Sequence, residues 1–161
     1  MRRLPVPPML TALVQSGILG IEGKEFARLD RCPFCGGIVT GYDMKERRFA
    51  ILQEEEGTRP VSVRVRRFSC RECGRISPAR APFYPDTRLG SPVVDLCVVL
   101  SREMPATRVA RVMGDLSLVV DRGTVRNYSH RDFGEIPVTE FYGISIPRSL
   151  MTLSLMGMQG P

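Results

Sequence analysis

The sequence predicts an α+β fold in which a small antiparallel sheet is followed by a unit of three short helices. Two Cys-x-x-Cys pairs, an alternating apolar and polar stretch leading into the second pair, and a later stretch with helical periodicity predict this order. The chain has 161 residues, of which 43% are hydrophobic and 25% charged, as in soluble proteins of one or two small domains. This composition excludes collagen-like, fully disordered and multi-span membrane proteins.

Changes in composition divide the chain into four segments. Residues 1–30 are an N-terminal helical segment with a proline-rich start, and residues 31–88 carry the cysteine pairs. Residues 89–134 have helical periodicity, and residues 135–161 form an apolar, methionine-rich C-terminal tail.

The N-terminal segment predicts a helix near residues 8–19, closed by Gly20 and Gly23. Prolines and Gln15 interrupt its apolar run, and no small-x-small cleavage pattern follows. We therefore interpret it as an amphipathic helix of a cytoplasmic protein rather than as a signal peptide. No stretch approaches the roughly 18 apolar residues of a membrane span, so no membrane partner is expected.

The two cysteine pairs predict a metal site. Cys32 and Cys35 precede two glycines, and Cys70 and Cys73 precede one. Zn²⁺ in structural sites takes four tetrahedral thiolates, which two such turns can supply. All four positions are then filled by protein, so the zinc is expected to be structural. An iron site and a redox dithiol are the alternatives.

The strand signals lie between and around the cysteines. Residues 61–66 alternate apolar and polar side chains and lead into Cys70, which predicts a strand. Residues 48–52 are the expected partner strand, joined through an acidic turn at 54–57, and residues 38–42 are expected to form a third strand. A small antiparallel sheet that carries two Cys-x-x-Cys-Gly turns is a zinc ribbon. Because so small a sheet has little core, metal binding should contribute to its folding.

Residues 89–134 predict three helices. Ser91 is expected to be the N-cap of the first, Pro105 to begin the second and Gly114 to end it, and Asp121 to be the N-cap of the third. Three helices in this arrangement are typical of a helix-turn-helix unit, although the connection at 115–120 is longer than usual.

Three side chains of the helical segment are expected in the core. Cys97 lies on an apolar helix face, and Val125 and Tyr128 are three residues apart on another helix. In the tail, residues 141–158 are expected to form a strand and a short helix.

Basic side chains predict a surface for double-stranded DNA. Basic residues number 23 against 17 acidic ones, and Lys24 and Lys45 are the only lysines. Arginine suits bidentate contacts to guanine or phosphate, and asparagine pairs with adenine. An ordinary solvated face is the alternative. The candidate DNA-binding residues are Arg122, Thr124, Arg126, Asn127 and Arg131 in the third helix and Arg64 and Arg66 in the strand.

Four motifs carry a family resemblance: Cys-Pro-x-Cys-Gly at 32–36, Phe-x-Cys-x-x-Cys-Gly at 68–74, Phe-Tyr-Pro-Asp-Thr-Arg-Leu-Gly at 83–90, and Asp-x-x-Thr-Val-Arg-Asn-Tyr at 121–128. Together they resemble the N-terminal DNA-binding part of transposase-like proteins of archaea and bacteria, which join a zinc ribbon to a helix-turn-helix unit. In such proteins the Thr-Val-Arg-x-aromatic run opens the recognition helix. Too few residues follow residue 134 for their catalytic domain, so the resemblance implies the DNA-binding part alone.

The sequence thus predicts a zinc-dependent DNA-binding protein, either a transcriptional regulator or the stand-alone DNA-binding part of a transposase. A structural zinc-ribbon module for protein interaction and an RNA-associated ribbon protein are the alternatives. An enzyme with a small-molecule substrate is not expected, because His130 is the only histidine and no Ser-His-Asp set or phosphate-binding glycine loop is present. Since operators are often palindromic, a homodimer is a further arrangement that we consider.

Overall fold

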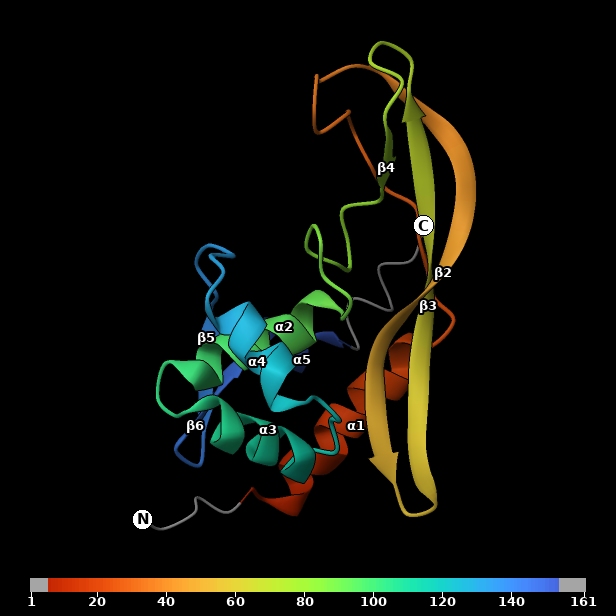
Figure 1. The fold of residues 1–161 in the computed structure, drawn as a ribbon. Coiled ribbons are helices and arrows are strands. Elements are labelled where there is room, and N and C mark those ends of the chain that lie inside the picture. Colours follow the sequence, from red (N-terminus) through yellow and green to blue (C-terminus); the bar gives the residue numbers. More distant parts are fainter. Residues whose placement is uncertain (1–5, 154–161) are drawn as a thin grey trace.

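The computed structural model describes residues 6–153 and shows a mixed α+β fold (Figure 1). A long β-hairpin stands on one side and the helices gather on the other, against the half of the hairpin that carries its turn. The elements in chain order are α1 (Pro8–Ile21), β1 (Glu25–Phe26), β2 (Val39–Glu54), β3 (Gly57–Cys70), β4 (Ile76–Pro78), α2 (Ser91–Ser101), α3 (Ala106–Asp115), α4 (Arg122–Ser129), β5 (Val138–Phe141), β6 (Ile144–Pro147) and α5 (Arg148–Met151).

The hairpin of β2 and β3 organises the larger sheet. Its antiparallel register runs from Val39 opposite Cys70 to Glu54 opposite Gly57. The acidic turn and the strand over 61–66 are therefore confirmed. The expectation of separate strands at 38–42 and 48–52 is wrong, because β2 continues through both by means of two register shifts, after Gly41 and after Arg48. On its other edge β3 pairs with β1 in parallel and with β4 in antiparallel orientation.

The two faces of the hairpin differ in burial. Val61, Val63 and Val65 are buried, whereas Arg64, which lies between two of them, and Arg66, which follows the last, are exposed. Since side chains alternate along a strand, the valines define an inner face that joins the hydrophobic core, and the two arginines define an outer face. The core is one cluster with contributions from α1, the hairpin, α2 to α4, β6 and α5.

Helices α2, α3 and α4 occupy the segment where three helices were predicted. Cys97, Val125 and Tyr128 are buried in them, as predicted. The Asp121 side chain accepts a hydrogen bond of 2.7 Å from the backbone N–H of Thr124, so its prediction as an N-cap is confirmed. The expected cap at Ser91 is wrong: Gly90 precedes the helix, and the Ser91 hydroxyl donates to the Pro82 carbonyl instead.

Residues 115–120 contain the long connection between α3 and α4. Helix α3 continues through Gly114 to Asp115, so the predicted end at Gly114 is one residue early. Beyond it, Leu118 forms a β-bridge with Leu52, and the Val119 N–H donates to the Ile51 carbonyl at 2.9 Å. The additional residues thus pair with the edge of β2, which explains why the connection exceeds a three- or four-residue turn.

The tail folds back on the body of the molecule. It forms a hairpin of β5 and β6 followed by α5, so it contains two short strands where one was expected and brings the helices within residues 6–153 to five. Ser149 of α5 donates to Asp95 of α2 at 2.6 Å, and Leu153 lies against Gly17 of α1. The last part of the segment predicted over 141–158 lies outside the described residues.

None of the helices within residues 6–153 has the length and apolar character needed to span a membrane.

Gly90 provides a test of the contact between the hairpin and α2. A methyl group at Gly90 would overlap the ring of Phe49, which is fully buried, whereas a methyl group at Gly20 in α1 would meet no atom within 4 Å. We expect Gly90→Ala to lower the free energy of unfolding by about 1–3 kcal/mol through overpacking. Gly20→Ala should raise it by up to about 1 kcal/mol, because alanine favours helix. Urea denaturation measures both, and equal effects would contradict this packing.

Candidate metal centre and nucleic-acid surface

The first cysteine turn follows β1 and precedes β2. The N–H of Gly36 donates to the Cys32 carbonyl at 2.9 Å, and the N–H of Cys32 donates to the Gly37 carbonyl at 3.0 Å. Gly36 has a φ of 75°, which glycine adopts without steric cost. The chain therefore reverses within the turn and brings Cys32 and Cys35 to the same side.

The second turn repeats this geometry between β3 and β4. The N–H of Gly74 donates to the Cys70 carbonyl at 3.1 Å, and the N–H of Cys70 donates to the Arg75 carbonyl at 2.9 Å. Gly74 has a φ of 74°. A hydrogen bond of 3.0 Å from the N–H of Arg71 to the Ile38 carbonyl joins the two turns.

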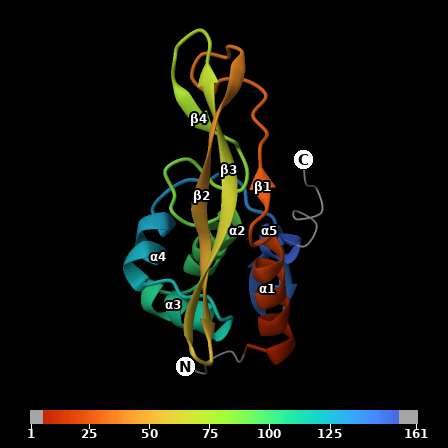
Figure 2. The same ribbon diagram turned by 90° about the vertical axis from the view of Figure 1, so that its right-hand side faces the viewer.

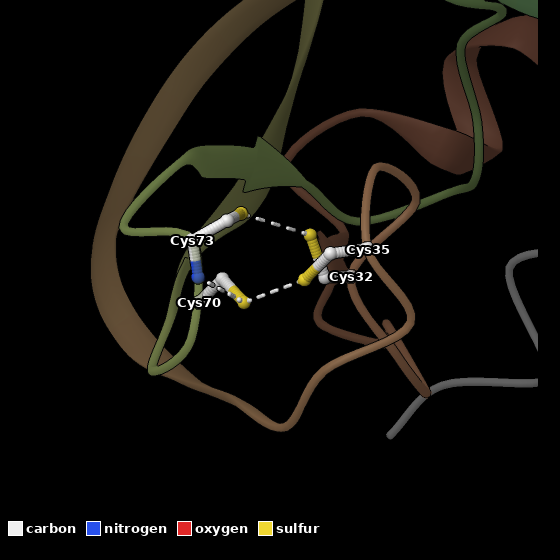
Figure 3. A group of neighbouring side chains, drawn as sticks. All are labelled: Cys32, Cys35, Cys70 and Cys73. Carbon is white, nitrogen blue, oxygen red and sulfur yellow. Dashed lines mark hydrogen bonds between the residues drawn. The ribbon is translucent and has the colours of Figure 1, made fainter.

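The four sulfur atoms converge at the tip of the ribbon. Figure 3 shows the two cysteine pairs facing each other, and all four Sγ atoms lie within 4.8 Å of one another. The contacts between turns are 3.6 Å from Cys32 to Cys73 and 3.4 Å from Cys35 to Cys70. A zinc tetrahedron with Zn–S bonds of about 2.3 Å has S–S edges of about 3.8 Å. The four cysteines are thus positioned to hold a metal ion, and their spacing fits zinc.

Backbone amides stabilise a thiolate at this centre. The N–H groups of Cys73 and Glu72 each lie 3.4 Å from the Cys70 sulfur. These two hydrogen bonds, that of Cys73 first, lower the pKa of Cys70 to about 6. Contact with the Cys70 side chain raises the pKa of Cys35 to about 12. One sulfur of this pair is therefore a ready metal ligand at neutral pH, and the other releases its proton when a metal binds.

Helix α4 carries most of the predicted DNA-binding residues. Arg122, Arg126 and Asn127 are exposed, and Thr124 is partly exposed. Arg131 follows the helix and has a different environment: its guanidinium donates to the carbonyls of Asp86 and Pro85 at 3.0 and 2.9 Å. The structure thus brings the first four together on α4 and directs Arg131 toward the preceding loop.

The two predicted strand residues lie apart from α4. Arg64 and Arg66 are on the outer face of the hairpin, opposite the valines that join the helical core. Arg64 also forms an ion pair of 2.9 Å with Glu25 of β1. The ribbon therefore separates these arginines from the helix with which they were expected to act.

The basic residues of β2 were missed by the sequence analysis. Lys45 and Arg47 lie opposite Val65 and Val63, on the inner face of the hairpin. They were overlooked because residues 43–47 fell between two expected strands. Had one strand been predicted through 39–54, the alternation of side chains along it would have placed Lys45 and Arg47 on the inner face.

Comparisons with known proteins give no relative of this chain: no family model, no curated protein and no solved structure matches it. The resemblance to transposase-like DNA-binding proteins therefore stays a prediction.

Removal of one cysteine tests the metal centre. We expect about one zinc per chain in the unmodified protein and almost none in Cys70→Ser, because three thiolates bind a structural zinc far more weakly than four. Cys97→Ala is the matched control, since Cys97 is buried away from the centre beside Met113. Elemental analysis after dialysis against a weak chelator measures the content. A full equivalent of zinc in Cys70→Ser would contradict the four-sulfur site.

Proposed function

We propose that this chain is a zinc-dependent protein that binds double-stranded DNA and acts as a transcriptional regulator or as the DNA-binding part of a transposase. The observation that carries the proposal is the surface of α4. Arginine and asparagine side chains are exposed there, and two buried residues fix the opposite side of the helix. These are the side chains that read guanine and adenine edges in the major groove.

The contacts that hold α4 in place favour a rigid helix, as base recognition requires. Val125 and Tyr128 anchor the helix in the core. The Asp121 carboxylate caps its first turn, and the Tyr128 hydroxyl accepts a hydrogen bond of 3.1 Å from the N–H of Arg88. A base-reading helix needs such support because its side chains must meet base edges in a fixed register.

The charge of the chain agrees with a polyanionic partner. The net charge is +6 and the sequence pI is about 9.4. Phosphate neutralisation by basic residues supplies most of the non-specific affinity for DNA. In this proposal the metal centre is structural, since four cysteines leave zinc no open position for a substrate.

A protein-interaction module is the second candidate, favoured by one observation. Phe34 and Ile38 beside the metal centre are 60% and 61% exposed. Apolar side chains at the tip of a ribbon fit contact with another protein.

Phe34 also lies under the Arg75 guanidinium at 4.3 Å, an arrangement on which an RNA base could stack.

Two arginine variants test the DNA-binding proposal. We expect Arg126→Ala to weaken binding to a duplex selected from a random library by about tenfold, because a bidentate base contact is worth about 1–3 kcal/mol. Arg66→Ala is the matched control on the outer face and should change the affinity by less than about twofold. Fluorescence anisotropy over a salt series measures both. Duplex affinity that is absent, or that is unchanged by salt and by Arg126→Ala, would overturn the proposal.

A further inference from the structure

The inner face of the ribbon has an open depression between the metal centre and the helices. Its volume is about 410 Å³, and its lining combines basic and apolar side chains from β2, β3 and β4: Lys45, Glu46, Arg47, Val65, Arg67, Ile76 and Pro78. This depression is separate from the four-sulfur centre and includes no residue of α4.

The charged side chains that line the depression differ in the interactions they make with other residues. Arg67 forms a bidentate pair with Asp43 across the strands, and that hydrogen-bonded pairing lowers the pKa of Asp43. The guanidinium of Arg47 donates to the Thr87 carbonyl at 2.6 Å and lies 3.8 Å over the Phe83 ring. Lys45 is exposed, and its positive charge, after the pairing with Arg67, also contributes to lowering the pKa of Asp43. Three positive charges thus share the inner face with the single paired carboxylate of Asp43, and Lys45 is the cation most accessible to a ligand.

A chain of contacts joins the depression to α4. Arg47 holds Thr87 from the ribbon side, and Arg131 holds Pro85 and Asp86 from the helix side. Both arginines therefore donate hydrogen bonds to carbonyls of the same short loop, residues 85–87. In the middle of the ribbon, β2 lies on the side of α3 and α4, whereas β1 lies on the side of α1 (Figure 2). Lys45 and Arg47 belong to β2, so the strand that supplies two of the cations of the depression is the one on the side of α4.

We propose that this depression binds a backbone phosphate of the duplex that α4 reads, with Lys45 as the main contact. The inference rests on the proposed DNA-binding function and assigns it a second contact surface. An open, shallow site with a mobile ammonium suits a phosphodiester on a large ligand, since Lys binds phosphate as a point charge and needs no enclosed cavity. Such a contact fixes the register of the duplex and carries no sequence preference.

The two lysines of the chain provide a matched test. Lys24 is exposed, lies between α1 and β1, and does not line the depression. We expect Lys45→Ala to weaken binding to every duplex by about the same factor, several-fold at low salt. It should also reduce the slope of log affinity against log salt by about 1. Lys24→Ala should leave both quantities unchanged, and Lys45→Arg should restore them. Zinc content and the urea midpoint establish that each variant is folded.

The outcomes separate this inference from the proposed function. If Arg126→Ala weakens binding but Lys45→Ala matches the unmodified protein, the phosphate site is wrong and the DNA-binding function stands. If the unmodified protein binds no duplex, both fail. Inorganic phosphate at constant ionic strength distinguishes the ligand source. If calorimetry detects phosphate binding at low millimolar concentration that Lys45→Ala removes, while duplex affinity is the same with and without Lys45→Ala, the depression is a free-anion site and the duplex assignment is wrong.

Discussion

The register of the β2–β3 ladder is the constraint on which the rest of the molecule depends. By placing Val39 opposite Cys70, it sets the first cysteine turn beside the second. The same ladder directs Val61 and Val63 into the core. Side chains alternate with a period of two, so a slip of one residue would turn the valines outward. That slip would also separate the sulfurs, and the metal centre and the hydrophobic core therefore select the same pairing from opposite ends of the hairpin.

The two ends of the ribbon are stabilised by different physical means. Near the turn, Phe49 and Val61 of the hairpin belong to one buried cluster with residues of α1 and α2–α4, so burial of apolar surface stabilises this end. Near the cysteines the one further strand within residues 6–153 is β4, which has three residues, and Phe68 is only partly buried. A sheet this small has little apolar area to bury. Four metal–thiolate bonds would supply there the cross-linking that the core supplies elsewhere.

Much of this structure could be predicted from local signals, and the exceptions are non-local. The spacing of the cysteines predicted each of the two turns, and Asp121 predicted the start of a helix, because a turn and a cap each depend on adjacent residues. The meeting of the two turns was inferred from the four ligands that zinc requires. The continuity of β2 could not be predicted in this way. Its two register shifts depend on the partner strand. A reader of the sequence alone does not know of these shifts, and the alternation of apolar and polar residues therefore looks interrupted around residues 43–47.

The structure of the connection at 115–120 and the partners of Arg131 also could not be predicted from the sequence. Leu118 pairs with Leu52, and Arg131 bonds to carbonyls at positions 85 and 86. Both partners are far away in the sequence. A helical pattern places a side chain on a face, but it does not identify the backbone groups that a long guanidinium reaches.

Arginine therefore has several distinct roles in this chain that composition cannot separate. Arg67 neutralises a carboxylate, Arg47 and Arg131 hold one loop from two sides, and Arg126 remains exposed on α4. To hold the loop, Arg47 and Arg131 need a planar group that donates hydrogen bonds to backbone carbonyls in fixed directions. A lysine ammonium provides such directed bonds less well. These bonds from arginine side chains to loop carbonyls hold the loop between β2 and α4, and together with the buried Val125 and Tyr128 they fix the position of α4 relative to the ribbon. In the proposed complex, a duplex seated on both surfaces would meet a preformed pair of contacts, and less of its binding free energy would be lost in ordering the protein.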